Sequence, residues 1–175
     1  MQKDAIVDLL EDKHQDLFDF LNEHHPERWE AGPEGKWTTG QHIVHLLESA
    51  KFINTALSMP KFVLKYKYGK ANRPVRDYTT VINRYQERLS TVEPGTTFGP
   101  TSPKKVPPLK DKDYLMDRLK MECKKLQYKT KKWKDTHLDT YIVPHPLMGK
   151  MPVREMIMWS AYHVQLHTET LKEKY

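Results

Sequence analysis

The sequence predicts an all-α protein, a four-helix bundle with an additional short helix and a long proline-rich connection. In four long segments apolar residues recur every three to four positions, the spacing of one buried helix face. No segment alternates apolar and polar residues over the length of a strand, and no repeat of 20–50 residues is present. At 175 residues the chain is long enough for a single domain, residues 1–175, with a substantial core.

The first two long helices are marked by clear boundaries. The first is predicted over residues 3–23 and ends before Pro26. The second begins at Thr38, which stands three residues before Gln41 in the pattern of a capping box, with Trp37 placed to contact the first turn. On the first helix we expect the buried face to contain Ile6, Leu9, Leu10, Leu17, Phe20 and Leu21. On the second helix we expect it to contain Ile43, Leu46, Leu47, Ala50, Ile53 and Leu57.

The middle of the chain is less regular. After Pro60, the sequence indicates a short helical or irregular stretch that ends at Gly69. A shorter third helix is predicted over residues 79–89. Residues 91–110 contain five prolines and predict an extended surface connection, which we expect to cover one end of the bundle.

Residues 111–133 predict the fourth helix and lie in the most basic part of the chain. The segment from Lys104 to Lys134 holds twelve Lys or Arg residues and four acids, in a chain of net charge +6. A nucleic acid or another polyanion could bind such a segment. Because the acids come first and the lysines last, the order that a helix dipole favours, the pattern points instead to a solvent-exposed helix face. The predicted inward residues are Tyr114, Leu115, Leu119, Cys123, Leu126 and Thr130 or Trp133.

The last helix carries the most informative motif. It is predicted to begin at Pro152, which suits a first helical position, and to reach Leu171. Its apolar face includes Ser160, His163 and His167, while the predicted outer residues are Arg154, Glu155, Gln165, Glu169 and Lys172. Two histidines one turn apart can point at a common atom, which suits a metal ion. Nine histidines give roughly half of one such pair by chance, so a third ligand from another helix is needed.

The second helix offers two candidates for that ligand. On a helical wheel His42 lies nearer the centre of the apolar stripe, and His45 lies towards its edge. Helical periodicity therefore does not decide between them.

Four segments together carry a family resemblance: GKWTTGQHIVHLLE, DYTTVINRYQERLS with the later GPTSP, LDTYIVPHPLMGKMPVREM, and AYHVQLHTE. They resemble the DinB/YfiT-like superfamily of four-helix-bundle proteins over nearly the whole chain. In that family, a histidine that precedes leucine on a tryptophan-led helix joins a His-x-x-x-His pair to bind a divalent metal, usually zinc or nickel. The resemblance assigns the metal to His45, His163 and His167, with His42 as the alternative to His45.

The resemblance also implies a chemistry. Three imidazoles leave an open position on a zinc ion, as in catalytic sites, and a water or thiol bound there has a lowered pKa. Characterised relatives include thiol-dependent S-transferases and an isomerase, and others are described as metal-dependent hydrolases. The glutamate of the HExxH zinc proteases is absent between His163 and His167. Candidates for a general base rest on proximity in the sequence alone: Glu48, His145, Tyr162 and Glu169.

We therefore expect a metal-dependent enzyme that acts on a small-molecule substrate, with a low-molecular-weight thiol as co-substrate or water as nucleophile. The alternatives are a non-catalytic metal-binding protein and, less favoured, a nucleic-acid binder. Cys123 is the only cysteine, which excludes an internal disulfide and fits a reducing cytoplasm. The N-terminus lacks the apolar core of a signal peptide, no apolar run is long enough to span a membrane, and a homodimer is left open.

Overall fold

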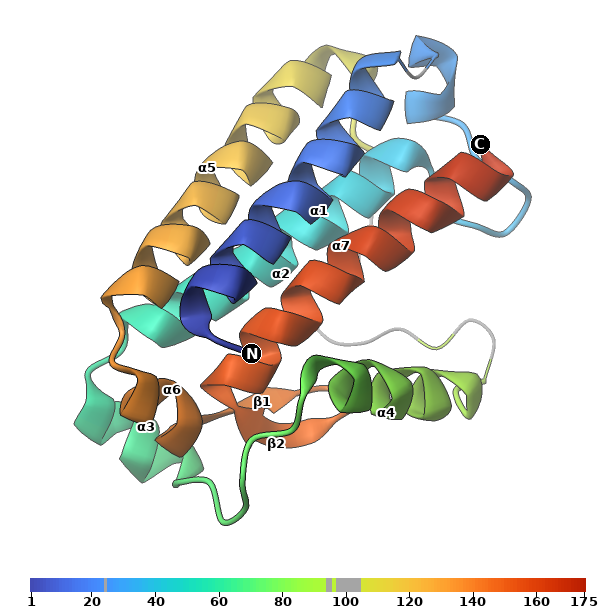
Figure 1. Cartoon of the computed structure of the whole chain (residues 1–175). Coiled ribbons are helices and arrows are strands. Elements are labelled where there is room, and N and C mark those ends of the chain that lie inside the picture. Colours follow the sequence, from blue (N-terminus) through green and yellow to red (C-terminus); the bar gives the residue numbers. More distant parts are fainter. Residues whose placement is uncertain (24, 94–95, 97–104) are drawn as a thin grey trace.

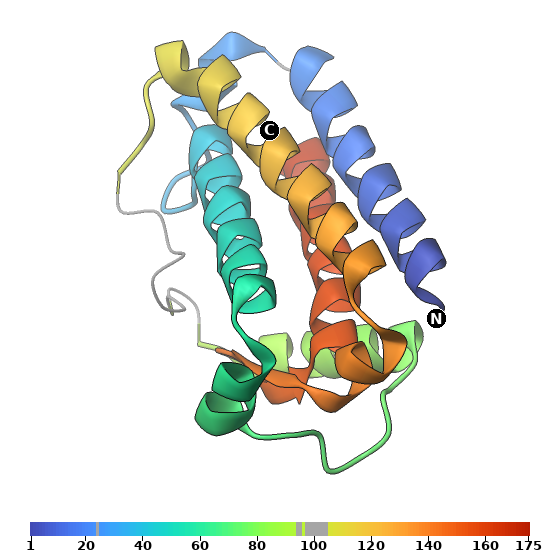
Figure 2. The same ribbon diagram turned by 90° about the vertical axis from the view of Figure 1, so that its left-hand side faces the viewer.

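The computed structural model describes residues 1–23, 25–93, 96 and 105–175, and four long helices form the predicted bundle (Figure 1). They are α1 (Lys3–Glu23), α2 (Thr39–Ser58), α5 (Lys112–Lys132) and α7 (Val153–Lys174). Both α1 and α2 pack against α5 and α7. The pair α1 and α7 runs in one direction and the pair α2 and α5 in the other (Figures 1 and 2). The predicted all-α four-helix bundle is confirmed.

These directions explain the long connection between α2 and α5. Helix α2 ends at the end of the bundle where α7 begins, whereas α5 begins at the opposite end (Figure 1). The chain between them contains α3 (Lys61–Tyr68), α4 (Tyr78–Ser90), which is the predicted short helix, and a 3₁₀ turn at Leu109–Asp111. The predicted proline-rich cover falls largely outside the described residues.

The segment between α5 and α7 departs from the prediction. A short helix, α6 (Asp135–Thr140), leads into a two-stranded antiparallel hairpin of β1 (Ile142–His145) and β2 (Gly149–Pro152). The expectation that the chain contains no strands is wrong here, because four-residue strands that each contain a proline are too short to show alternation. Pro152 is the N-cap of α7, so the helix starts one residue later than predicted.

Buried residues form two hydrophobic clusters along the bundle. One surrounds the start of α7 and includes side chains of α3, α4, α6 and the hairpin. The other lies around the second half of α7, between α1, α2 and α5. Tyr162 belongs to the first cluster and Val164 to the second. His163 therefore lies where the two clusters meet, on a helix that both of them hold in place.

Two predicted helix faces need correction. Tyr114 was expected to face inward but is 64% exposed, and Met116 is buried in its place because it continues the stripe of Leu119, Cys123 and Leu126. On α7, Arg154 and Glu155 were expected outside but are only 6% and 0% exposed.

The start of α7 is buried on all sides because α4, α6 and the hairpin pack on it in addition to the bundle helices. A helical wheel drawn for a bare four-helix bundle cannot anticipate this extra layer. In the described part of the chain, no helix combines the length and the apolar character needed to cross a bilayer.

Candidate metal centre

Helix α2 places two histidines opposite α7. Its N-terminus is fixed by the predicted capping box: the Thr38 hydroxyl accepts from the Gln41 backbone N–H at 3.2 Å, and the Gln41 side chain accepts from the Thr38 N–H at 2.9 Å. His42 and His45 follow within the first two turns. Because α2 and α7 are neighbours, both imidazoles meet the histidines of α7.

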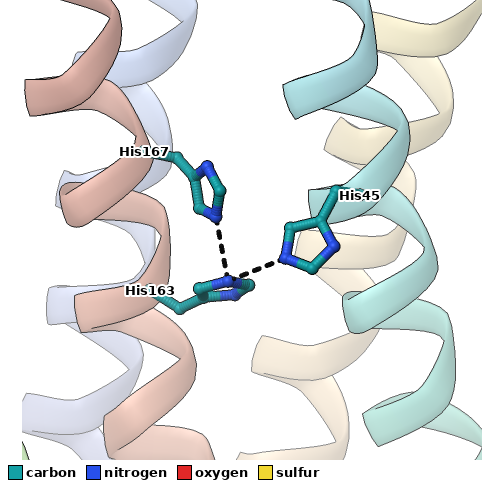
Figure 3. A group of neighbouring side chains, drawn as sticks. All are labelled: His45, His163 and His167. Carbon is teal, nitrogen blue, oxygen red and sulfur yellow. Dashed lines mark hydrogen bonds between the residues drawn. The ribbon is translucent and has the colours of Figure 1, made fainter. Parts of the chain in front are cut away.

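Three imidazole nitrogens converge between the two helices (Figure 3). The Nε2 atom of His163 lies 3.0 Å from Nε2 of His45 and 3.0 Å from Nε2 of His167. His45 comes from α2, and the other two come from successive turns of α7. The structure thus brings together the three histidines that the family resemblance assigns, and their binding of a metal stays a prediction.

Hydrogen bonds among the three imidazoles cannot satisfy all three converging nitrogens. A ring nitrogen of a neutral imidazole either donates one hydrogen or accepts through one lone pair. His163 Nε2 faces two nitrogens at hydrogen-bond distance and can form a good hydrogen bond with only one of them. A divalent cation can accept a lone pair from all three, and nitrogens bound to tetrahedral zinc lie roughly 3.3 Å apart. The donor set is therefore compatible with a divalent metal ion.

Burial keeps the imidazoles of His163 and His167 neutral. The pKa values of His163 and His167 lie well below 6.5, chiefly because burial disfavours the charged ring and secondarily because other imidazoles are close. A neutral imidazole has a free lone pair, which is the form that binds a metal. Near pH 7 the two rings of α7 need not lose a proton before they bind an ion.

His42 contacts the ring of His167 on the edge opposite to the one that faces His163. Its Nδ1 lies 2.7 Å from Nδ1 of His167, whereas Nε2 of His167 faces His163. Because the two nitrogens of an imidazole point in different directions, His42 lies behind His167 as seen from the three converging nitrogens. Of the two candidates that the helical wheel left open, the structure places His45 in the cluster and His42 outside it.

Comparison with known proteins agrees with this fold. The profile of the DinB superfamily matches residues 9–171. The chain belongs to the DinB superfamily. A solved structure described as TT2238, a four-helix bundle protein, is similar with a TM-score of 0.59 at 18% identity, covering 98% of this chain and 99% of that one, a likeness that shows the fold alone. Comparison with curated proteins gave no match.

Two tryptophans flank the histidines of this DinB-superfamily protein. Trp159 is buried and stacks on His163, with ring centroids 4.5 Å apart and an interplanar angle of 19°. Trp37, half-buried, lies 4.9 Å from the ring of His45 and runs parallel to His167 at 6.2 Å. These contacts restrict the orientation of all three rings. Trp37 leads the helix in the motif on which the resemblance rests, while only the structure shows that Trp159 packs on a candidate ligand.

The two carboxylates proposed as bases are bonded along their own helices. Glu48 forms an ion pair with Lys51 at 2.7 Å, and Glu169 accepts a hydrogen bond from Gln165 at 2.7 Å. Glu169 is exposed. Their proximity in the sequence therefore does not translate into a contact with the three converging nitrogens among the interactions of the described residues.

Tyr162 and His145, the other two candidates, have partners on other elements of the fold. The Tyr162 hydroxyl accepts a hydrogen bond from Gln86 of α4 at 2.7 Å. His145 Nδ1 accepts from two backbone N–H groups of the hairpin turn, both at 3.0 Å, so its proton lies on Nε2. The ring of His145 packs edge-on against Trp159 at 4.2 Å, and burial lowers its pKa to about 4. Because sequence reasoning missed the hairpin, it could not place His145 next to the stacked pair of Trp159 and His163.

A separate polar cleft of about 300 Å³ lies between α2 and α5. Several of its cations already have partners in the bundle: Lys125 pairs with Glu122 at 2.7 Å, and Lys129 donates to the Asn54 carbonyl oxygen at 2.7 Å. The basic segment was predicted to be a solvent-exposed helix face, and the structure adds that Lys125 and Lys129 of this segment also bond within the bundle. The lining residues are Lys51, Asn54, Thr55, Ser58, Arg118, Glu122, Lys125 and Lys129.

Proposed function

We propose that this DinB-superfamily protein is a metal-dependent enzyme in which His45, His163 and His167 hold a divalent ion, zinc or nickel. The observation that carries the proposal is the convergence of three imidazole nitrogens, in which Nε2 of His163 lies 3.0 Å from Nε2 of His45 and 3.0 Å from Nε2 of His167. The metal-compatible group found among the described residues has three members, whereas structural zinc sites normally have four protein ligands. Three ligands leave room for a substrate or a water molecule.

The chemistry of such a centre follows from the fact that neutral imidazole ligands leave the metal ion its full positive charge. When bound, a divalent ion held by neutral ligands acts as a Lewis acid that lowers the pKa of a thiol or a water in its open position. The residues of the chain supply the rest. His45 joins α2 to the centre, Trp37 and Trp159 hold the imidazoles in orientation, and burial keeps His163 and His167 unprotonated.

For the substrate, we propose a low-molecular-weight thiol and a small electrophile. The support is the resemblance to thiol-dependent members of the superfamily, together with the affinity of thiolate sulfur for zinc. The thiolate sulfur would attack an electrophilic carbon, a sulfur–carbon bond would form as the bond to the leaving group breaks, and the leaving group would depart with the electron pair. The thiol proton would pass to solvent. A hydrolase that uses water in place of the thiol is the variant of this proposal.

The test uses metal-depleted protein, reloaded with zinc or nickel, and chlorodinitrobenzene as the electrophile with cysteine or glutathione as the thiol. Chloride release should require the loaded metal and should be lost in His163→Ala. The exposed His25 provides the control, since His25→Ala should retain the activity. Equal rates with and without metal, or in His163→Ala and the wild type, would contradict the proposal.

A non-catalytic metal-binding protein is the second candidate. It is favoured by the fact that Glu48 and Glu169, the carboxylates near the histidines in sequence, are bonded to neighbours on their own helices. Stoichiometric metal without turnover of thiols or of activated esters would support this alternative. We do not propose nucleic acid as a partner, because the bonds of Lys125 and Lys129 favour a structural role for the basic helix face.

A further inference from the structure

The contact between His42 and His167 has a role that the three-histidine motif does not assign. We propose that His42 is a positioning residue: it accepts a hydrogen bond from Nδ1 of His167 and thereby directs the Nε2 lone pair of His167 towards the metal. The inference rests on the proposed metal centre. Its basis is the 2.7 Å separation between the two Nδ1 atoms.

The direction of this hydrogen bond follows from counting protons. Between two neutral imidazoles, one nitrogen must donate and the other must accept. If Nε2 of His167 binds a metal, its lone pair is used there, and the single ring proton must be on Nδ1. His167 is then the donor and His42 the acceptor, with the His42 proton on Nε2. In the opposite arrangement, the His167 proton would sit on Nε2 and point at His163, which would block metal binding.

His42 is buried against two aromatic rings, which keep its Nδ1 beside His167. It is 7% exposed, and its ring lies edge-on to Trp37 at 5.5 Å and to Tyr175 at 5.8 Å. The Tyr175 hydroxyl donates to the Trp37 carbonyl oxygen, which links the C-terminal residue to the residue before the N-cap of α2. The acceptor nitrogen of His42 is therefore fixed relative to α2, the helix that also carries His45.

One helix would thus supply a metal ligand and the group that orients a second ligand. Histidines that bind metals usually donate their other ring N–H to such a partner, and loss of the partner typically weakens metal binding 10- to 100-fold. That partner is commonly a carboxylate or a carbonyl group. Here the acceptor is an imidazole, which adds no negative charge to the centre.

The test compares two substitutions of His42. His42→Phe keeps a flat ring for the contacts with Trp37 and Tyr175 but removes the acceptor, and His42→Asn restores an acceptor oxygen near the position of Nδ1. The zinc dissociation constant, measured by competition with a chromophoric chelator, should rise about 10- to 100-fold in His42→Phe and recover to within a few-fold in His42→Asn. His14→Phe is the matched control, because His14 is equally buried but bonds to the Leu10 carbonyl oxygen.

A second readout follows the proton directly. Long-range ¹H–¹⁵N spectra of the zinc-loaded wild type should show the His167 proton on Nδ1 and the His42 proton on Nε2. If His42→Phe does not fold, the same spectra of zinc-loaded His42→Asn test the role, and the His167 proton should again be on Nδ1. Zinc binding in His42→Phe as tight as in the wild type, or a proton on Nδ1 of His42, would overturn this role alone. A wild type that binds no zinc would overturn the proposed function and this role together.

Discussion

Helix α7 contains two buried polar clusters, and they are satisfied in different ways. At its start, Glu155 accepts hydrogen bonds from the guanidinium of Arg73, one at 2.8 Å, and from the backbone N–H of Arg76 at 2.7 Å. This hydrogen bonding to Glu155 raises the pKa of Arg73. The neighbouring Arg154 donates to two carboxylates of α6, those of Asp135 and Asp139.

From its middle onward, the same helix presents the imidazoles of His163 and His167, whose ring nitrogens lie within 3.0 Å of each other and of His45 and His42 of α2. Each charged side chain in the first cluster has an opposite charge beside it, whereas the converging nitrogens of the second cluster all belong to imidazoles. Burial and polarity alone therefore do not mark a functional site. The first cluster is completed by the chain itself and supports the fold, whereas the second is compatible with a divalent metal ion.

The largest effect should come from breaking the first cluster. Glu155→Ala leaves Arg73 and Arg76 without their carboxylate, and we expect a loss of about 3–5 kcal/mol in the free energy of unfolding, measured with urea. The zinc affinity of the folded protein should not change. Glu169→Ala, an exposed carboxylate on the same helix, should stay within about 0.5 kcal/mol. If Glu155→Ala kept the stability of the wild type but lost its zinc affinity, the roles assigned to the two clusters would be wrong.

The second cluster should respond to metal instead. Zinc at a free concentration of 100 times its dissociation constant should stabilise the wild type by about 2.7 kcal/mol, because only the folded chain holds the three nitrogens together. His163→Ala should gain nothing from the same zinc. The measurement is urea unfolding with and without zinc. Equal stabilisation of both proteins would place the bound metal elsewhere.

Lowering the pH should destabilise the fold, because a buried neutral histidine resists protonation that the unfolded chain accepts. Burial lowers the pKa of His14 to about 4, so between pH 6.5 and 4 the unfolded chain takes up a proton there that the folded chain does not. Stability therefore falls as pH falls through this range. On going from pH 7.5 to 5.0, His14→Gln should lose about 2 kcal/mol less than the wild type in urea unfolding. An identical loss in both proteins would show that His14 titrates normally.

The smallest effect is expected at the buried thiol. Burial raises the pKa of Cys123 to about 12, so the thiol is protonated near neutral pH and is a poor nucleophile. Cys123→Ala should cost about 1 kcal/mol of stability and leave zinc affinity and thiol-transfer rates unchanged. Rapid alkylation of Cys123 by iodoacetamide in the folded protein, or loss of activity in the variant, would contradict its assignment to the core.

The sequence was informative wherever the signal is local. Helical periodicity predicted α1, α2, α5 and α7, the Thr38 capping box is present, and the spacing of His163 and His167 placed both on one side of α7. The family resemblance selected His45. Periodicity could not do so, because the wheel of one helix does not contain the angle at which its neighbour crosses it.

What sequence reasoning missed depends on contacts between distant segments. Arg154 and Glu155 look like outer residues of an amphipathic helix, and they are buried only because Arg73, Arg76 and α6 fold back onto them. The hairpin that carries His145 was too short to show a strand pattern. The role proposed for His42 depends on which edge of the His167 ring it touches, and spacing along the chain carries no such information.

The central claim is that His45, His163 and His167 hold one divalent ion. It is tested most directly by elemental analysis of protein loaded with zinc and then dialysed against a chelating resin, for the wild type and for His163→Ala in parallel. The account predicts about one zinc ion per chain in the wild type and almost none in the folded variant. Equal zinc content in the two proteins, or none in either, would contradict it.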